Sequence, residues 1–204
     1  IMVLRDGEHV ATRPTGELDR NALIELMVGR KLENEFPAHT PQIGEERLVV
    51  TGLRRGSAVK DVSFSVRAGE ILALTGLVGA GRTETVRLLF GADRPDAGSV
   101  TLDGKPLHLR SPRHAIGAGI GLLTEDRKSQ GLVLIHPVRE NFGLPNLGQF
   151  TRWGFVNRRN ERRGFGSFVD SLRIKIPHQE ELAQNLSGGN QQKVVLAKWL
   201  QRNC

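Results

Sequence analysis

The sequence predicts an α/β fold organised around one glycine-rich loop. Three observations support this prediction: an apolar run typical of a buried strand, a loop with three glycines, and a helical pattern directly after it. The apolar run covers residues 71–74, the loop extends from Gly76 to Gly81, and the helix is expected to stop at Gly91. This uninterrupted order of strand, loop and helix is the context that an anion-binding loop requires.

The loop matches a phosphate-binding pattern at every position except one. Gly76, four residues, Gly81, a cation and Thr83 follow the pattern, but the cation is Arg82 where lysine is expected. Glycines let backbone N–H groups turn toward an anion, and the helix N-terminus adds partial positive charge. An ordinary tight turn is the simpler alternative, although three glycines and a cation at this spacing are costly for a turn alone. The expected phosphate-binding residues are Gly76, Leu77, Val78, Gly79, Ala80, Gly81, Arg82, Thr83 and Glu84.

Composition limits the functional classes. The 204 residues are 38% hydrophobic and 25% charged, as in soluble globular proteins, and no apolar run approaches the roughly 20 residues of a membrane span. No secretory signal is recognised, and the single cysteine, Cys204, makes a reducing cytosol the default expectation. The net charge of +7 could suggest nucleic acid, but the basic residues are scattered apart from two arginine pairs at 158–159 and 162–163. A charged helix face explains those pairs, so no nucleic acid is expected.

Residues 1 to 35 are predicted to be the end of a preceding domain. A strand at 2–4, a hairpin partner at 9–12 and a helix capped by Asp19 and stopped by Gly29 are expected. This fragment has too little apolar surface to form its own core. Residues 36–45 contain two prolines and no periodicity, which predicts a linker.

From residue 46 the pattern is that of a new domain, 46–204. Strands are expected at 48–50 and 62–66, a hairpin turn at Asp103 and Gly104, a short helix opened by Ser111 and Pro112, and another apolar strand at 120–124. From about 132 to 185 the pattern becomes helical, with helices around 138–142 and 157–172 and a short extended exit at 174–176.

A second glycine cluster precedes the last predicted helix. Ser187 can cap that helix, and Gly188 and Gly189 expose its first amides. Taken alone, this is a good helix N-terminus; about a hundred residues after a phosphate loop, it becomes a second anion site. The apolar stripe expected to be buried is Val195, Leu196, Trp199 and Leu200.

With both glycine loops in place, the chain resembles the ATP-binding-cassette (ABC) ATPases from about residue 46 to 204. This implies a P-loop NTPase fold: an ABC-type nucleotide-binding domain with an antiparallel β subdomain and a helical subdomain. It also implies ATP and Mg²⁺ as cofactors, with Thr83 as a metal ligand. The stretch that looks like the family signature is Leu186, Ser187, Gly188, Gly189, Asn190 and Gln191.

Within this family, the chain resembles ATPase subunits of bacterial monosaccharide importers of the ribose, galactose and xylose type, which carry two cassettes in one polypeptide. Residues 79–84, 125–128 and the signature are similar to the second cassette, and residues 1–30 look like the end of the first. The resemblance thus implies a second cassette that is truncated at its C-terminus. The family's catalytic aspartate, glutamate and histidine lie beyond the signature, so no catalytic residue is expected in this chain, which we predict to be inactive alone.

Three departures from the family pattern concern the nucleotide site. Glu125 stands where the family has a glutamine; its carboxylate can coordinate magnesium, directly or through water, but repels a terminal phosphate. Arg82 keeps the cationic charge with a bulkier, planar group. Without an aromatic residue between Phe36 and Phe64, only Arg54 or Arg55 could stack on adenine, and both are more simply explained as solvated turn residues.

The resemblance implies that two cassettes close on ATP, each phosphate loop facing the other cassette's signature. The implied partners are the first cassette of the same polypeptide, membrane permease subunits and, indirectly, a periplasmic sugar-binding protein. The implied location is peripheral, on the cytoplasmic face of the inner membrane, with residues 125–138 and the helical insert as the coupling surface. Two alternatives remain: a non-transport cassette ATPase acting on nucleic acid or the ribosome, and a regulatory, non-hydrolysing nucleotide-binding module. Without neighbouring central strands, the phosphate-loop strand would expose apolar surface.

Overall fold

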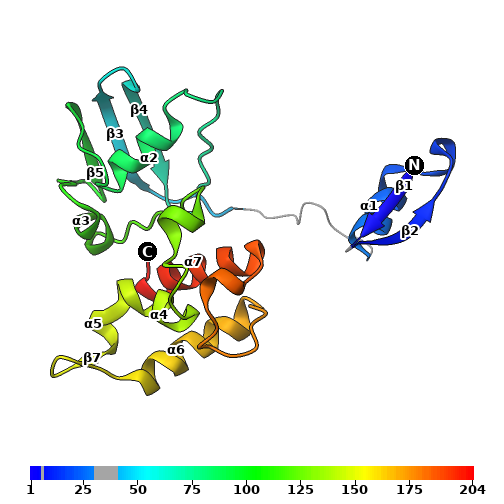
Figure 1. The fold of residues 1–204 in the computed structure, drawn as a ribbon. Helices are drawn as coiled ribbons and strands as arrows, with labels where there is room; N and C mark the ends of the chain where they lie inside the picture. The colour runs from blue at the N-terminus through cyan, green and yellow to red at the C-terminus, as the bar shows by residue number, and fades with distance from the viewer. Residues whose placement is uncertain (6, 30–40) are drawn as a thin grey trace. The chain divides into compact units, whose positions relative to one another are not determined.

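The computed structural model describes residues 1–5, 7–29 and 41–204, and the chain forms two compact units, Ile1–Gln42 and Ile43–Cys204 (Figure 1). The boundary between the units lies within the segment 36–45 that was expected to be a linker. Residues 36–40 of that segment lie outside the described residues. No helix in the described ranges is long and apolar enough to cross a membrane.

The first unit is a hairpin with one helix. Strands β1 (Met2–Arg5) and β2 (Glu8–Thr12) pair antiparallel, and a 3-10 turn at Thr15–Glu17 leads to α1 (Arg20–Val28). Asp19 caps α1, because its Oδ1 accepts a hydrogen bond of 2.6 Å from the Ala22 amide, and Gly29 ends it at φ 80°. The predicted hairpin and helix are therefore confirmed. Val3 is the buried residue of this unit among those described.

The second unit contains an antiparallel sheet covered by one helix. Strands β3 (Glu46–Arg55), β4 (Val59–Arg67), β5 (Ala97–Leu102) and β6 (Lys105–Pro106) are arranged in the order β4-β3-β5-β6. Helix α2 (Arg82–Leu89) buries Leu88 and Leu89 against Val50, Leu53 and Val59 of the sheet. The turn between β5 and β6 is formed by Asp103 and Gly104, both at positive φ, as predicted from this residue pair.

From about residue 132 onward the second unit is mainly helical, as the sequence predicted. Its core joins Val138, Phe142, Phe165, Val194 and Val195, and the rings of Phe142 and Phe165 lie 5.1 Å apart between centroids. The helices are α3 (Pro112–Gly117), α4 (Val138–Gly143), α5 (Leu147–Phe150), α6 (Arg158–Ser171) and α7 (Gly188–Arg202), with a π-helical turn at Arg127–Gly131 and 3-10 turns at Leu144–Asn146 and Ala183–Asn185. A small hairpin, β7 (Thr151–Arg152) and β8 (Phe155–Val156), precedes α6.

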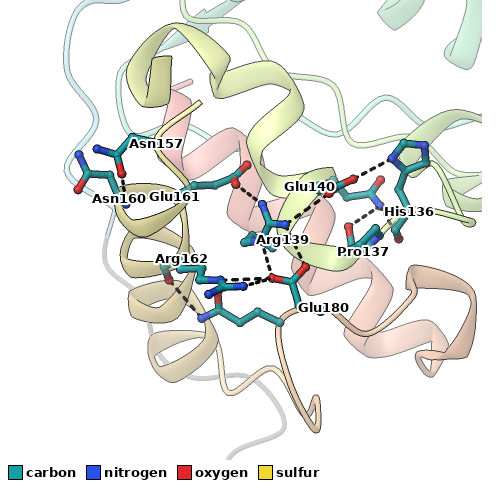
Figure 2. Close-up of polar contacts among 11 residues, drawn as sticks. His136, Pro137, Arg139, Glu140, Asn157, Asn160, Glu161, Arg162 and Glu180 are labelled. Carbon is teal, nitrogen blue, oxygen red and sulfur yellow. Dashed lines mark hydrogen bonds and ion pairs between the residues drawn. The ribbon is translucent and has the colours of Figure 1, made fainter. Parts of the chain in front are cut away.

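A buried ion network fastens α4 to α6 and to the loop before the signature (Figure 2). Arg139, whose side chain is 3% exposed, donates hydrogen bonds from Nη1 to Glu161 and from Nε to Glu180 Oε1, the latter at 2.9 Å. Arg162 donates to the same Glu180 oxygen at 2.9 Å. Hydrogen bonding to Arg139 is the main reason that the pKa of Glu180 falls to about 2. The network fixes the orientation of α6 relative to α4.

Two strand predictions were wrong. Residues 71–74 and 120–124 form no strand, and the Ile71 side chain is 91% exposed. A strand is stabilised by hydrogen bonds to a neighbouring strand, and among the described residues no strand pairs with either segment. The apolar residues at 71–74 consequently form an exposed surface, as expected for a strand without neighbours.

The predicted buried face of α7 was wrong by part of a turn. Val195 and Trp199 are buried, but Leu196 is half-buried and Leu200 is exposed. The buried face instead includes Gln191 and Val194, because α4 and α6 approach the helix from that side. The segment 174–176 is irregular, with no helix or strand.

Candidate functional site

The glycine-rich loop is curled and open to solvent. The Ala80 amide donates a 3.0 Å hydrogen bond to the Leu77 carbonyl, and a Cβ added to Gly76 would lie 3.0 Å from the Ala80 Cβ. Gly79 has φ 82°, in the left-handed region that favours glycine, with open space around it. Leu77 and Val78 point into solvent. The loop is therefore neither extended nor covered, and its backbone is accessible to an anion.

Gly81 joins this loop to the first turn of α2. It has φ 82° and packs so closely on the Ala58 carbonyl that any Cβ would collide with it. The Thr85 hydroxyl donates a 2.7 Å hydrogen bond to the Gly81 carbonyl, which fixes the start of the helix. The first amides of a helix have no acceptor within it, so Arg82, Thr83 and Glu84 present free N–H groups toward the loop.

Thr83 and Glu125, the two residues expected to bind magnesium, are close together. The Thr83 hydroxyl donates to Glu125 Oε1 at 3.5 Å, and both line a cavity of about 300 Å³ that also includes Arg82. Hydroxyl and carboxylate oxygens are ligands that Mg²⁺ accepts, so the residues present fit the ion. In the described ranges no cluster of three or more His, Cys, Asp or Glu suggests another metal site.

The second glycine cluster opens α7. Ser187 occupies the N-cap position, but the expected side-chain cap is not formed, because its Oγ accepts a 3.1 Å hydrogen bond from Asn190 Nδ2 instead. A Cβ on Gly189 would meet no atom within 4 Å, so this side of the helix start is open. The N-terminus of α7 thus offers unpaired amides on an accessible face.

The segment 125–131 connects the two glycine clusters. The sequence did not predict this connection. Arg127 Nε donates a 3.1 Å hydrogen bond to Gln191 Oε1, and the guanidinium packs directly against Gly188. At the other end of the segment, Lys198 Nζ donates to the Gly131 carbonyl. Burial lowers the pKa of Lys198 to about 8. Lys198 lies at the helical spacing of the buried residues of α7, and this position in the sequence could have predicted its contact with the segment.

Asp126 stabilises the turn within that segment. Its carboxylate accepts hydrogen bonds from the Ser129 hydroxyl at 2.7 Å and the Lys128 amide at 3.0 Å, which lower its pKa. The segment 125–131 is therefore internally bonded as well as tied to α7.

The two glycine clusters do not meet directly. Among the described residues, no hydrogen bond or ion pair joins 76–84 to 186–191. Arg54 and Arg55, the possible adenine-stacking residues, lie at the end of β3 rather than in a turn, and pair with Asp61 at 3.0 Å and Asp93 at 2.5 Å. Both cations are therefore already engaged.

The family model described as ABC transporter matches residues 59–204. The ribose import ATP-binding protein RbsA 3 of Rubrobacter xylanophilus is 50% identical over 201 residues, covering 98% of this chain and 40% of that protein. RbsA of Oceanobacillus iheyensis is 45% identical over 200 residues, covering 98% and 40%. The chain thus spans about two fifths of the length of the curated relatives that it matches.

Solved structures show the same fold at low sequence identity. The dimeric, post-hydrolysis ATP-binding cassette MJ0796 bound to ADP and Pi aligns with a TM-score of 0.62 and 20% identity, covering 76% of this chain and 70% of that one. The ADP conformation of the cassette MJ1267 aligns with a TM-score of 0.61 and 20% identity, covering 78% and 66%. The fold class predicted from the sequence is therefore confirmed.

Proposed function

Since this chain belongs to the ABC transporter family, we propose that it is part of a subunit that couples ATP binding and hydrolysis to uptake of a monosaccharide. The observation that carries the proposal is the pair of open, glycine-containing helix N-termini: α2 follows its N-cap Gly81, and α7 begins with Gly188 and Gly189. The backbone N–H groups of each can donate hydrogen bonds to phosphate oxygens. The relatives are named ribose import proteins, which supports a monosaccharide as the transported substrate.

The phosphate-loop residues 76–84 bind the nucleotide phosphates, with the Arg82 guanidinium beside them. Thr83 and Glu125 hold Mg²⁺ through their side-chain oxygens. When bound, magnesium neutralises phosphate charge and orients the terminal phosphate. The Glu125 carboxylate adds negative charge at this position, so we expect ATP binding by this chain to be weak. Separately, the resemblance to the family implies that this chain has no turnover alone, because none of its residues matches the family's catalytic ones.

The signature residues 186–191 act on a second nucleotide. In this proposal, residues 1–35 end a preceding cassette, 36–45 are the linker and 46–204 belong to the second cassette. Ser187, Gly188 and Gly189 then cap ATP held by the first cassette. The subunit works at the cytoplasmic face of the membrane with permease subunits, which contact residues 125–138 and the helical insert, and a periplasmic sugar-binding protein delivers the sugar.

The test uses the full-length subunit assembled with its permease in vesicles. We expect ATP-dependent uptake of labelled ribose or galactose by the native complex and a loss of uptake with Gly188→Asp, which places a carboxylate at the signature amides. Uptake that does not need ATP, or that survives this substitution unchanged, would contradict the proposal. In parallel, the 204-residue chain is expected to release no phosphate above a protein-free blank; clear turnover would refute its predicted inactivity.

A regulatory role is the second candidate, and the proximity of Glu125 to Thr83 favours it. A carboxylate 3.5 Å from the metal-binding hydroxyl is compatible with a site that binds nucleotide without hydrolysing it. The two candidates predict different effects of replacing Arg82 by lysine and Glu125 by glutamine. ATP hydrolysis should increase strongly if the site is regulatory and change little if it is already active.

A further inference from the structure

The β7–β8 hairpin carries two aromatic side chains that pack against nothing. Trp153 is 88% exposed and Phe155 is 81% exposed. The hairpin projects from the helical part of the second unit just before α6 (Figure 1). Its turn is formed by Trp153 at φ 55° and Gly154 at φ 82°, the positive φ values of a tight two-residue hairpin turn. Two large rings on a protruding turn are unusual on a protein surface and point to a binding role.

Arginines lie next to these aromatic residues in the hairpin and directly after it in the sequence. Arg152 is paired with Phe155 across the hairpin, so the two side chains lie on the same face. Four more exposed arginines lie within the first turns of α6, and one of them, Arg162, is paired with Glu180. Within the described part of the chain, no ion pair engages the remaining four arginines, which are Arg152, Arg158, Arg159 and Arg163.

The acidic residues Glu161 and Glu180 are already bound to arginines of the ion network. Glu161 is the only acidic residue between 144 and 163, and it is buried in the contact with Arg139 (Figure 2). Glu180 is held by Arg139 and Arg162. The buried network therefore leaves the outer face of the hairpin and of the first turns of α6 with uncompensated positive charge.

This combination matches the chemistry of a bilayer surface. Aromatic rings favour the boundary between headgroups and acyl chains, and guanidinium groups bind phosphates at the level of the headgroups. A single-stranded nucleic acid would instead need a groove with successive stacking positions. We propose that Trp153, Phe155 and the four arginines contact the anionic headgroups of a lipid bilayer. This inference rests on the proposed function, which places the chain beside a membrane.

The test is cosedimentation of the 204-residue chain with vesicles of phosphatidylcholine, with and without phosphatidylglycerol. We expect binding only to the anionic vesicles, with a blue shift of tryptophan fluorescence that arises from Trp153, because Trp199 is already buried. Trp153→Ser/Phe155→Ser should weaken binding about tenfold and remove the shift. Ile71→Ser, at another highly exposed apolar residue, should bind like the native chain; equal losses in both would identify non-specific adsorption and overturn the proposal.

Charge is tested with a matched pair of variants. Arg158→Glu/Arg159→Glu should abolish binding to anionic vesicles, whereas Arg110→Glu/Arg113→Glu, with the same change in net charge, should retain most of it. Equal losses would reduce the effect to net charge and overturn the proposal. Absence of vesicle binding would point to a protein partner, and tighter binding to single-stranded RNA than to vesicles would point to nucleic acid; both outcomes contradict a lipid contact. Nucleotide binding measured on the same samples shows separately whether the proposed function holds.

Discussion

Arg127 Nε donates a 3.1 Å hydrogen bond to Gln191 Oε1, and this contact ties the segment after Glu125 to the first turns of α7. Because Glu125 also accepts a hydrogen bond from Thr83, the segment 125–131 touches both glycine clusters, between which the described part of the chain shows no hydrogen bond or ion pair. A change at one cluster can therefore reach the other through a few named contacts.

The Arg127–Gln191 bond should appear as a coupling energy. Arg127→Met and Gln191→Leu are each expected to destabilise the chain, and the double variant should lose less than the sum by about 1–2 kcal/mol, since the shared bond is lost only once. Urea unfolding of the four chains measures this difference. Strict additivity would show that the bond contributes nothing.

Gly81 and Gly79 form a matched pair with the same φ of 82° but different surroundings. Alanine at either position adopts an unfavourable backbone conformation, at roughly 1–2 kcal/mol. Gly81→Ala must also displace the Ala58 carbonyl and should be clearly less stable than Gly79→Ala, which has open space. Thermal unfolding compares the two; equal melting temperatures would contradict the close packing at Gly81.

The buried Arg139 should be far more important for stability than its exposed neighbour. Arg139→Met leaves Glu161 buried without its partner and should lower the free energy of unfolding by about 3–5 kcal/mol. Arg162→Met removes only an exposed contact to the same Glu180 and should have an effect of about 1 kcal/mol or less. Adding Glu161→Gln to Arg139→Met should recover part of the loss. A loss of stability as small as that of Arg162→Met would show that the network is not stabilised by its charges.

Lys198 gives a pH signature. Its pKa is about 8 in the folded chain and 10.5 in the unfolded one, so between these values the unfolded chain binds more protons and stability rises with pH. The rise attributable to Lys198 should total up to about 3 kcal/mol. It is measured as the difference between the native chain and Lys198→Met in urea unfolding from pH 7 to 10.5. Parallel pH profiles would contradict the lowered pKa of Lys198 in the folded chain.

The departures at Arg82 and Glu125 can be reversed. In a full-length subunit, Arg82→Lys with Glu125→Gln should change ATP hydrolysis little if the native site is already active, and increase it strongly if the site is regulatory. Glu125→Gln alone keeps a side-chain oxygen that can coordinate magnesium and removes a charge that repels the terminal phosphate, so it should tighten binding of magnesium–ATP. Weaker binding would show that the carboxylate is needed as a metal ligand.

Local signals in the sequence were sufficient for elements whose geometry is set locally. Asp19 and Gly29 define the limits of α1, and Asp103 with Gly104 defines a hairpin turn, because cap and turn residues act on their own backbone. The apolar segment 71–74 resembled a strand, yet pairing depends on residues distant in sequence. No strand among the described residues pairs with it.

In the candidate site, too, the local patterns were predictable from the sequence and the tertiary contacts were not. Both glycine clusters carry recognisable patterns, and the structure places them at the starts of α2 and α7. The contacts of Arg127 and Lys198 were missed, because they depend on how the segment 125–131 folds against α7. The prediction that Leu200 is buried was wrong for a similar reason. Helix α7 has apolar residues on two faces, and only tertiary packing decides which face is covered.

The most direct test of two nucleotide-binding loops is hydrogen–deuterium exchange on a full-length subunit carrying this chain, with and without magnesium and a non-hydrolysable ATP analogue. We predict slower exchange of the amides at 77–84 and, when the cassettes close, at 187–190. Unchanged exchange in 77–84 at saturating nucleotide would contradict the account.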